Sequence, residues 1–74
     1  MIESLIYKNM KIEVRGAKLA FAGFTYSVHI GDVEHSPSVV PLESWEQAKL
    51  EGIQYGMKLV DQVMDSFLPA TALQ

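Results

Sequence analysis

Residues 10–30 read MKIEVRGAKLAFAGFTYSVHI, and the spacing of their apolar side chains decides the fold. Met10, Ile12 and Val14 alternate with charged residues at the start of this stretch. From residue 24 to residue 30, apolar residues alternate again with threonine, serine and histidine. A period of two is typical of a β-strand that buries one face. The stretch therefore predicts two antiparallel strands joined by a tight turn.

The alternation changes phase between these two strands, because Leu19 and Phe21 stand at odd-numbered positions. A two-residue turn at residues 22–23 would keep Phe21 on the same face as the apolar residues that follow. We then expect a one-residue bulge at residues 15–16 to bring Val14 back to that face. Glycine is common in bulges, since it tolerates positive φ.

The first half of the chain therefore predicts a β-meander with strands over residues 2–7, 10–21 and 24–34. A turn at residues 8–9 would join the first strand to the second. Residues 39–40, both valine, are expected either to add a short fourth strand or to fill the core.

The second half predicts one long amphipathic helix. Ser44 is a good N-cap, and Gln47 completes a capping-box pattern three residues later. Pro69 predicts that the helix ends at residue 67 or 68, with residues 70–74 as a frayed tail. At 100° per residue, one broad face is apolar, and it consists of Trp45, Ala48, Gly52, Ile53, Gly56, Met57, Leu59, Val60, Val63, Met64 and Phe67. The expected fold class is thus two-layer α+β, a single small domain over residues 1–74 with a three-stranded antiparallel meander covered on one face by the C-terminal helix.

Ala48, Gly52 and Gly56 form a stripe of small residues on the apolar face of this helix. A glycine inside a helix costs about 1 kcal/mol relative to alanine, so a close packing contact is needed to offset the cost. We expect the helix to lie close to the sheet, with Phe21, Phe24 or Tyr26 above the two glycines. Contact with a helix of a second chain is the alternative.

Composition narrows the function classes. The chain has 74 residues, a net charge of −3, 49% hydrophobic residues and no cysteine. The lack of cysteine excludes disulfides, thiol catalysis and cysteine–zinc sites. So short a domain buries only about 60% of the surface of its unfolded chain, and small domains often recruit a partner. We expect a cytoplasmic protein, since Glu3 stands where a signal peptide carries positive charge and no stretch reaches the roughly 20 apolar residues that cross a bilayer.

The sequence predicts no catalytic residue, no cofactor and no metal site. It contains no phosphate-binding loop and no nucleophile elbow. His29 and His35, with Asp32 and Glu34 between them, form the densest polar cluster. On one straight strand the two histidines would point the same way, roughly 20 Å apart, too far to share an ion. A small enzyme or metal-binding domain is an alternative that needs a sharp bend at residues 31–32.

A nucleic-acid-associated regulatory module is another alternative. Basic and polar side chains could line the open face of the sheet, namely Lys11, Arg15 and Lys18 with Thr25, Ser27 and His29. Such side chains contact phosphates. The net charge of −3 and the position of Glu13 inside the patch oppose this alternative. We do not expect this chain alone to bind nucleic acid.

Apolar residues outside the predicted core favour a protein partner. Ile2 and Ile6 fall on the far face of the sheet, and residues 24–34 would form an edge strand without lysine or proline. Long unprotected edges invite pairing with another chain. We therefore expect a non-catalytic homodimer that binds another protein. Its predicted interface comprises Phe24, Tyr26, Ser27, Val28, His29, Ile30 and Tyr55.

The order of elements carries one resemblance. A strand hairpin, a loop and the segment LESWEQA at residues 42–48, which opens the helix, resemble the small sheet-plus-helix domains of HicB-type antitoxins. The build is equally similar to that of compact phage-encoded inhibitors. The resemblance covers the architecture and the capping pattern, and it implies a protein that acts by binding another protein.

Overall fold

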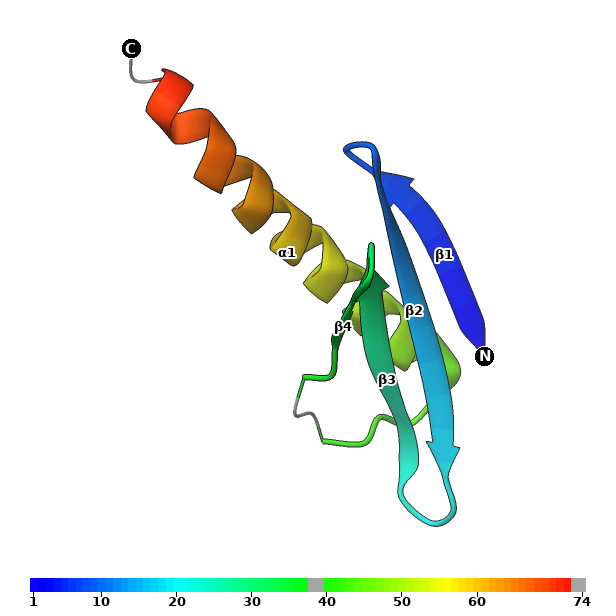
Figure 1. Cartoon of the computed structure of the whole chain (residues 1–74). Helices are drawn as coiled ribbons and strands as arrows, with labels where there is room; N and C mark the ends of the chain where they lie inside the picture. The colour runs from blue at the N-terminus through cyan, green and yellow to red at the C-terminus, as the bar shows by residue number, and fades with distance from the viewer. Residues whose placement is uncertain (38–39, 73–74) are drawn as a thin grey trace.

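A four-stranded antiparallel sheet with the order β1-β2-β3-β4 lies against one long helix in the computed structural model (Figure 1). The structure describes the backbone of residues 1–37 and 40–72, and the side chains of residues 1–37 and 40–65. The elements are β1 (Ile2–Tyr7), β2 (Met10–Leu19), β3 (Gly23–Ile30), β4 (Val33–His35) and α1 (Trp45–Ala72). The predicted α+β class, with a meander and a covering C-terminal helix, is confirmed.

The β1–β2 hairpin has the predicted turn and register. Tyr7 pairs with Met10, and Leu5 pairs with Ile12. The turn residues Lys8 and Asn9 have φ angles of 52° and 66°. Two positive φ angles are typical of the type I′ turn, whose twist matches that of the flanking strands.

The β2–β3 register differs from the prediction. The pairs run without interruption from Ile12 opposite Ile30 to Leu19 opposite Gly23, so the predicted bulge at residues 15–16 is wrong. The turn occupies residues 20–22 instead of 22–23, and Phe21 is fully exposed at its tip. A glycine is required at the end of this turn, because Gly23 has a φ of 107° and a Cβ there would collide with the carbonyl of Leu42.

Gly16 explains why the apolar pattern changes phase. The ring of Trp45 lies directly on Gly16, where a Cβ would overlap its carbon atoms. Gly16 thus stays on the helix-facing side without a side chain, and the tryptophan of α1 fills that position. Ala17 and Leu19 consequently point to the far face.

The strand predicted over residues 24–34 is two strands. The chain turns at residues 31–32, with Gly31 at a φ of 60°, and β4 returns along the end of β3. Leu42 also pairs with Phe24 through two backbone hydrogen bonds of 2.8 Å. The edge of β3 is therefore occupied near both of its ends, and the prediction of an open edge there is wrong.

The fourth strand consists of residues 33–35 instead of residues 39–40. Val40 is exposed and outside any strand, and Val39 lies outside the described residues.

Helix α1 begins at the predicted N-cap, although the side chain of Gln47 bonds to the amide before the N-cap instead of to the N-cap amide itself. Ser44 Oγ accepts a hydrogen bond of 3.2 Å from the Gln47 amide. Gln47 Oε1 accepts one of 3.0 Å from the Glu43 amide. The backbone stays helical past Pro69 to Ala72, although proline cannot donate an intrahelical hydrogen bond, so the predicted end at residue 67 or 68 is wrong. Fraying of residues 70–72 stays a prediction, and residues 73–74 lie outside the described residues.

The core lies between α1 and the two central strands. Its buried members are Ile12, Val14, Tyr26, Val28, Ile30, Ala48 and Val60. A Cβ at Gly52 would lie 2.6 Å from Val14 Cγ1, and a Cβ at Gly56 would lie 2.6 Å from Ile12 Cγ2. The small-residue stripe thus faces the sheet, and α1 approaches it closely enough for these side chains to touch the helix backbone. Burial raises the pKa of Tyr26 to about 12, and the nearby Glu51 carboxylate adds to the shift.

We expect Gly52→Ala and Gly56→Ala each to lower the free energy of unfolding by about 1–3 kcal/mol, because the new methyl group overpacks the core. Alanine would favour the helix by about 1 kcal/mol at an exposed position. Urea unfolding of Gln54→Ala, an exposed position on the same helix, provides the control and should change little. A rise in stability at residue 52 or 56 would contradict the close approach.

Candidate functional site

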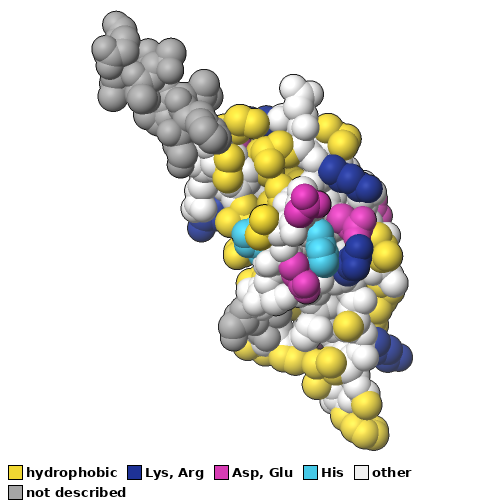
Figure 2. Space-filling model, viewed as in Figure 1, with side chains coloured by type: hydrophobic (Ala, Val, Ile, Leu, Met, Phe, Trp, Pro, Cys, Tyr) yellow, Lys and Arg dark blue, Asp and Glu magenta, His cyan; other side chains and the backbone are white. Residues whose placement is uncertain are grey.

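An apolar groove lies where the second half of α1 passes the β3–β4 hairpin. It has a volume of about 370 Å³. Its apolar lining consists of Met10, Ile30, Val33, Leu59, Val60 and Val63. Figure 2 shows hydrophobic side chains gathered near the point where the helix leaves the sheet. This is the strongest candidate for a binding surface on the described part of the chain.

The groove has a buried floor and an exposed rim. Ile30 and Val60 belong to the core, whereas Val33 and Val63 are 55% and 43% exposed. The turn at residues 31–32 creates this arrangement, because it places Val33 opposite Ile30 in the sheet. Both rim residues lie on regular elements, so the groove is formed by the fold itself and not by a loop.

His35 lies on the same side of the sheet as the groove. This residue of β4 pairs with Val28 of β3. Its ring packs edge-on against the ring of Tyr55 in α1, with a centroid distance of 6.4 Å. This contact links β4 to the helix at the end of the groove.

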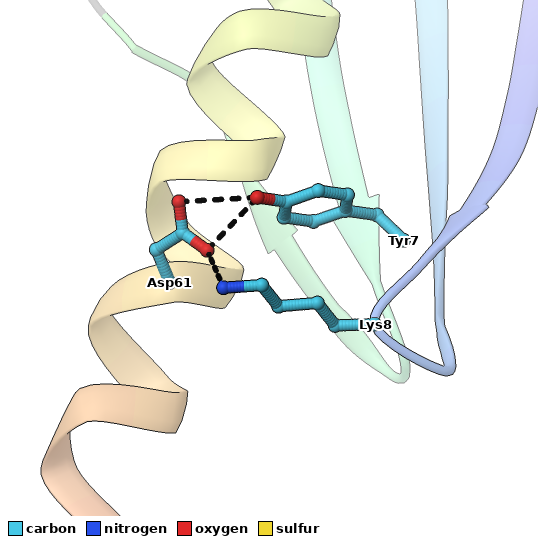
Figure 3. Close-up of polar contacts among 3 residues, drawn as sticks. All are labelled: Tyr7, Lys8 and Asp61. Atoms are coloured by element: carbon cyan, nitrogen blue, oxygen red, sulfur yellow. Dashed lines mark hydrogen bonds and ion pairs between the residues drawn. The ribbon is translucent and has the colours of Figure 1, made fainter.

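Tyr7, Lys8 and Asp61 form a polar cluster on the side of α1 that faces the β1–β2 turn (Figure 3). Tyr7 Oη donates to Asp61 Oδ1 at 3.0 Å, and Lys8 Nζ donates to the same oxygen at 2.6 Å. The Lys8 hydrogen bond lowers the pKa of Asp61, and Asp61 in turn raises the pKa of Lys8. The cluster ties the β1–β2 turn to α1, while the groove lies on the β3–β4 side.

The far face of the sheet carries fewer cations than predicted. Lys11 Nζ lies 3.9 Å from Glu13, and Arg15 forms an ion pair with the same carboxylate. The Arg15 hydrogen bond lowers the pKa of Glu13. Lys18 is opposite Phe24 in the register, so it falls on the helix-facing side. The predicted row of three basic residues is therefore wrong, because the bulge that would have aligned them is absent.

The two histidines lie on opposite faces. His29 is on the far face, with its Nε2 3.3 Å from Ser27 Oγ, and His35 faces the helix. The reversal of the chain at residues 31–32 separates them, so the prediction that they point the same way is wrong. Among the described residues, no group of three or more His, Cys, Asp or Glu side chains could hold a metal ion.

The predicted interface residues are dispersed by the fold. Tyr26, Val28 and Ile30 are buried in the core. Ser27 and His29 lie on the far face, and the remaining two, Phe24 and Tyr55, are half-buried against neighbours. The prediction missed Val33 as a rim residue because it assigned residues 24–34 to one strand. The dipeptide Gly31-Asp32 is the local turn signal that could have revealed it.

The chain matches no family model, no curated protein and no solved structure. Within the described ranges, α1 is not apolar enough over any sufficient length to cross a membrane.

We expect Asp61→Asn to reduce stability at neutral pH and to flatten its dependence on pH in acid. Because the pKa of Asp61 is lowered in the folded state, its stabilising contribution is present above the ordinary aspartate value and disappears as the pH falls through the folded value. Unfolding by urea, measured from about pH 5 to pH 2, should show a smaller loss of stability than in the unsubstituted chain.

Asp65→Asn, at an exposed position one turn further along α1, is the matched control for this experiment. If the curves for Asp61→Asn and the unsubstituted chain run parallel over that range, the cluster does not stabilise the fold.

Proposed function

We propose that this chain is a non-catalytic protein-binding module that acts as a homodimer and takes an apolar segment of another protein into the groove. The observation that carries this proposal is the exposed apolar rim, Val33 and Val63, above a floor of core residues. A concave site with a mainly apolar lining is the form that binding sites usually take.

The shape of the groove suits side chains better than a whole secondary-structure element. Its volume of about 370 Å³ is near the lower end of the range of roughly 300–1,000 Å³ for ligand sites. A few apolar side chains of a partner would fill it. The Tyr7–Lys8–Asp61 cluster and the His35–Tyr55 contact hold α1 on both sides, so the groove is prepared for binding without rearrangement.

The homodimer is supported by apolar residues on the far face. Ile2 and Ile6 of β1 are 63% and 68% exposed. These side chains do not contribute to the core between the sheet and α1. Association that brings these side chains of two copies together would shield part of their surface from water, at a gain of roughly 25 cal/mol for each Å² of apolar surface buried.

A photo-cross-linking amino acid at position 63 tests the groove. In cells that express the protein, we expect a discrete adduct with one partner when the probe replaces Val63. The same probe at Leu50, which is 57% exposed on another side of α1, should not form that adduct. Identical adducts at both positions, or none at position 63, would contradict binding in the groove.

Sedimentation velocity tests the homodimer. We expect a reversible dimer at micromolar concentrations, with the fraction of monomer rising on dilution. A chain that sediments as a monomer across this concentration range would exclude the homodimer and leave the groove proposal to the cross-linking experiment.

A further inference from the structure

The outer edge of β1 is the longer of the two edges of the sheet in the described part of the chain, since the other edge strand, β4, has three residues. β1 is the first strand in the order β1-β2-β3-β4, and α1 packs mainly over β2 and β3. Figure 1 shows β1 at the side of the sheet away from β4. β1 contains neither lysine nor proline, which commonly block an edge. Its one charged residue, Glu3, is paired with Lys49 of α1 at 4.0 Å.

The backbone groups at this edge follow from the register. The Gly16 amide donates to the Met1 carbonyl at 2.7 Å, and residues of an antiparallel pair alternate between bonded and non-bonded positions. Glu3, Leu5 and Tyr7 therefore bond to β2. The N–H and C=O groups of the residues between them, Ile2, Ser4 and Ile6, point outward.

We propose that a second copy of this chain pairs its β1 antiparallel with this edge, about a two-fold axis at Ser4. This inference rests on the proposed homodimer and specifies its contact. The outward positions read isoleucine, serine, isoleucine, which is the same sequence in either direction. The backbone of Ile2 would form hydrogen bonds with that of Ile6 in the second copy, and the backbone of Ser4 with that of its own counterpart. Every outward N–H and C=O group of β1 would then have a partner.

The side chains select this register over its neighbours. A shift by one residue would pair far-face residues with helix-facing ones. A shift by two residues in one direction sets Glu3 opposite its own counterpart, and like charges directly opposite are destabilising. A shift by two in the other direction sets Ile2 opposite Lys8, a residue of the turn. In the proposed register Glu3 is opposite Leu5, and the exposed isoleucines of the two copies lie side by side.

Ser4→Pro tests the proposed contact directly. Its amide points outward, so proline removes the hydrogen bonds at the two-fold axis without removing one to β2. We expect the dimer dissociation constant to rise about tenfold or more, measured by sedimentation with circular dichroism as the check of folding. Ile6→Lys, at an exposed side chain on the same edge, should act in the same direction and serves if the proline variant does not fold.

Two further variants complete the experiment: Leu50→Lys is a control, and Val63→Lys tests whether the two copies meet through the groove instead. Leu50→Lys should leave the dimer unchanged, since this residue lies on α1 away from β1. If Val63→Lys dissociates the dimer while folded Ser4→Pro and Ile6→Lys do not, the two copies meet through the groove and the β1 contact is wrong, although the homodimer stands. A monomeric unsubstituted chain would overturn both.

A thiol cross-linker reports the two-fold axis independently. The chain has no cysteine, so Ser4→Cys introduces a single thiol. Opposed residues of a hydrogen-bonded antiparallel pair have Cα atoms about 5.5 Å apart, within reach of a short bismaleimide. We expect efficient covalent dimers from Ser4→Cys and few from Leu50→Cys. Equal yields from both variants would contradict an axis at Ser4.

Discussion

The close approach of α1 to the sheet is the constraint on which the rest of the structure depends. Gly52 and Gly56 leave the helix backbone bare where Val14 and Ile12 reach it. Larger residues at these two positions would lift the helix from the sheet and open the core. Because the core of this domain is small, about 2 kcal/mol at this contact would be a large part of the free energy of unfolding.

The same approach determines which surfaces remain open. Since α1 is held over β2 and β3, it covers neither the outer edge of β1 nor the space beside β4. Asp61 is then positioned to meet Tyr7 and Lys8 on one flank, and Val63 faces the groove on the other. Both proposed binding surfaces thus follow from where the helix is anchored.

Features that depend on neighbouring residues could be predicted from the sequence. The turn at residues 8–9 and the cap at Ser44 are local, and both have the predicted positions. The β2–β3 register could not be predicted, because it depends on Trp45 covering Gly16 and on Leu42 approaching Gly23. Those contacts join segments far apart in the chain, and each exploits the missing side chain of a glycine. The groove was missed for a related reason. It exists only where α1 passes the β3–β4 hairpin, and the alternation of apolar residues predicts one continuous strand there.

The two proposed surfaces are compatible within one assembly. The β1 edge and the β4 side lie at opposite ends of the strand order, so the proposed pairing through β1 would join two four-stranded sheets into one and leave a groove at each outer end. In such a dimer, the two identical grooves would bind two apolar segments of an oligomeric partner together. Binding at the second groove is then intramolecular, and the apparent affinity rises without any new contact. A weak dimer of a small domain could in this way bind tightly to a repeated target, although each groove accepts only a few side chains.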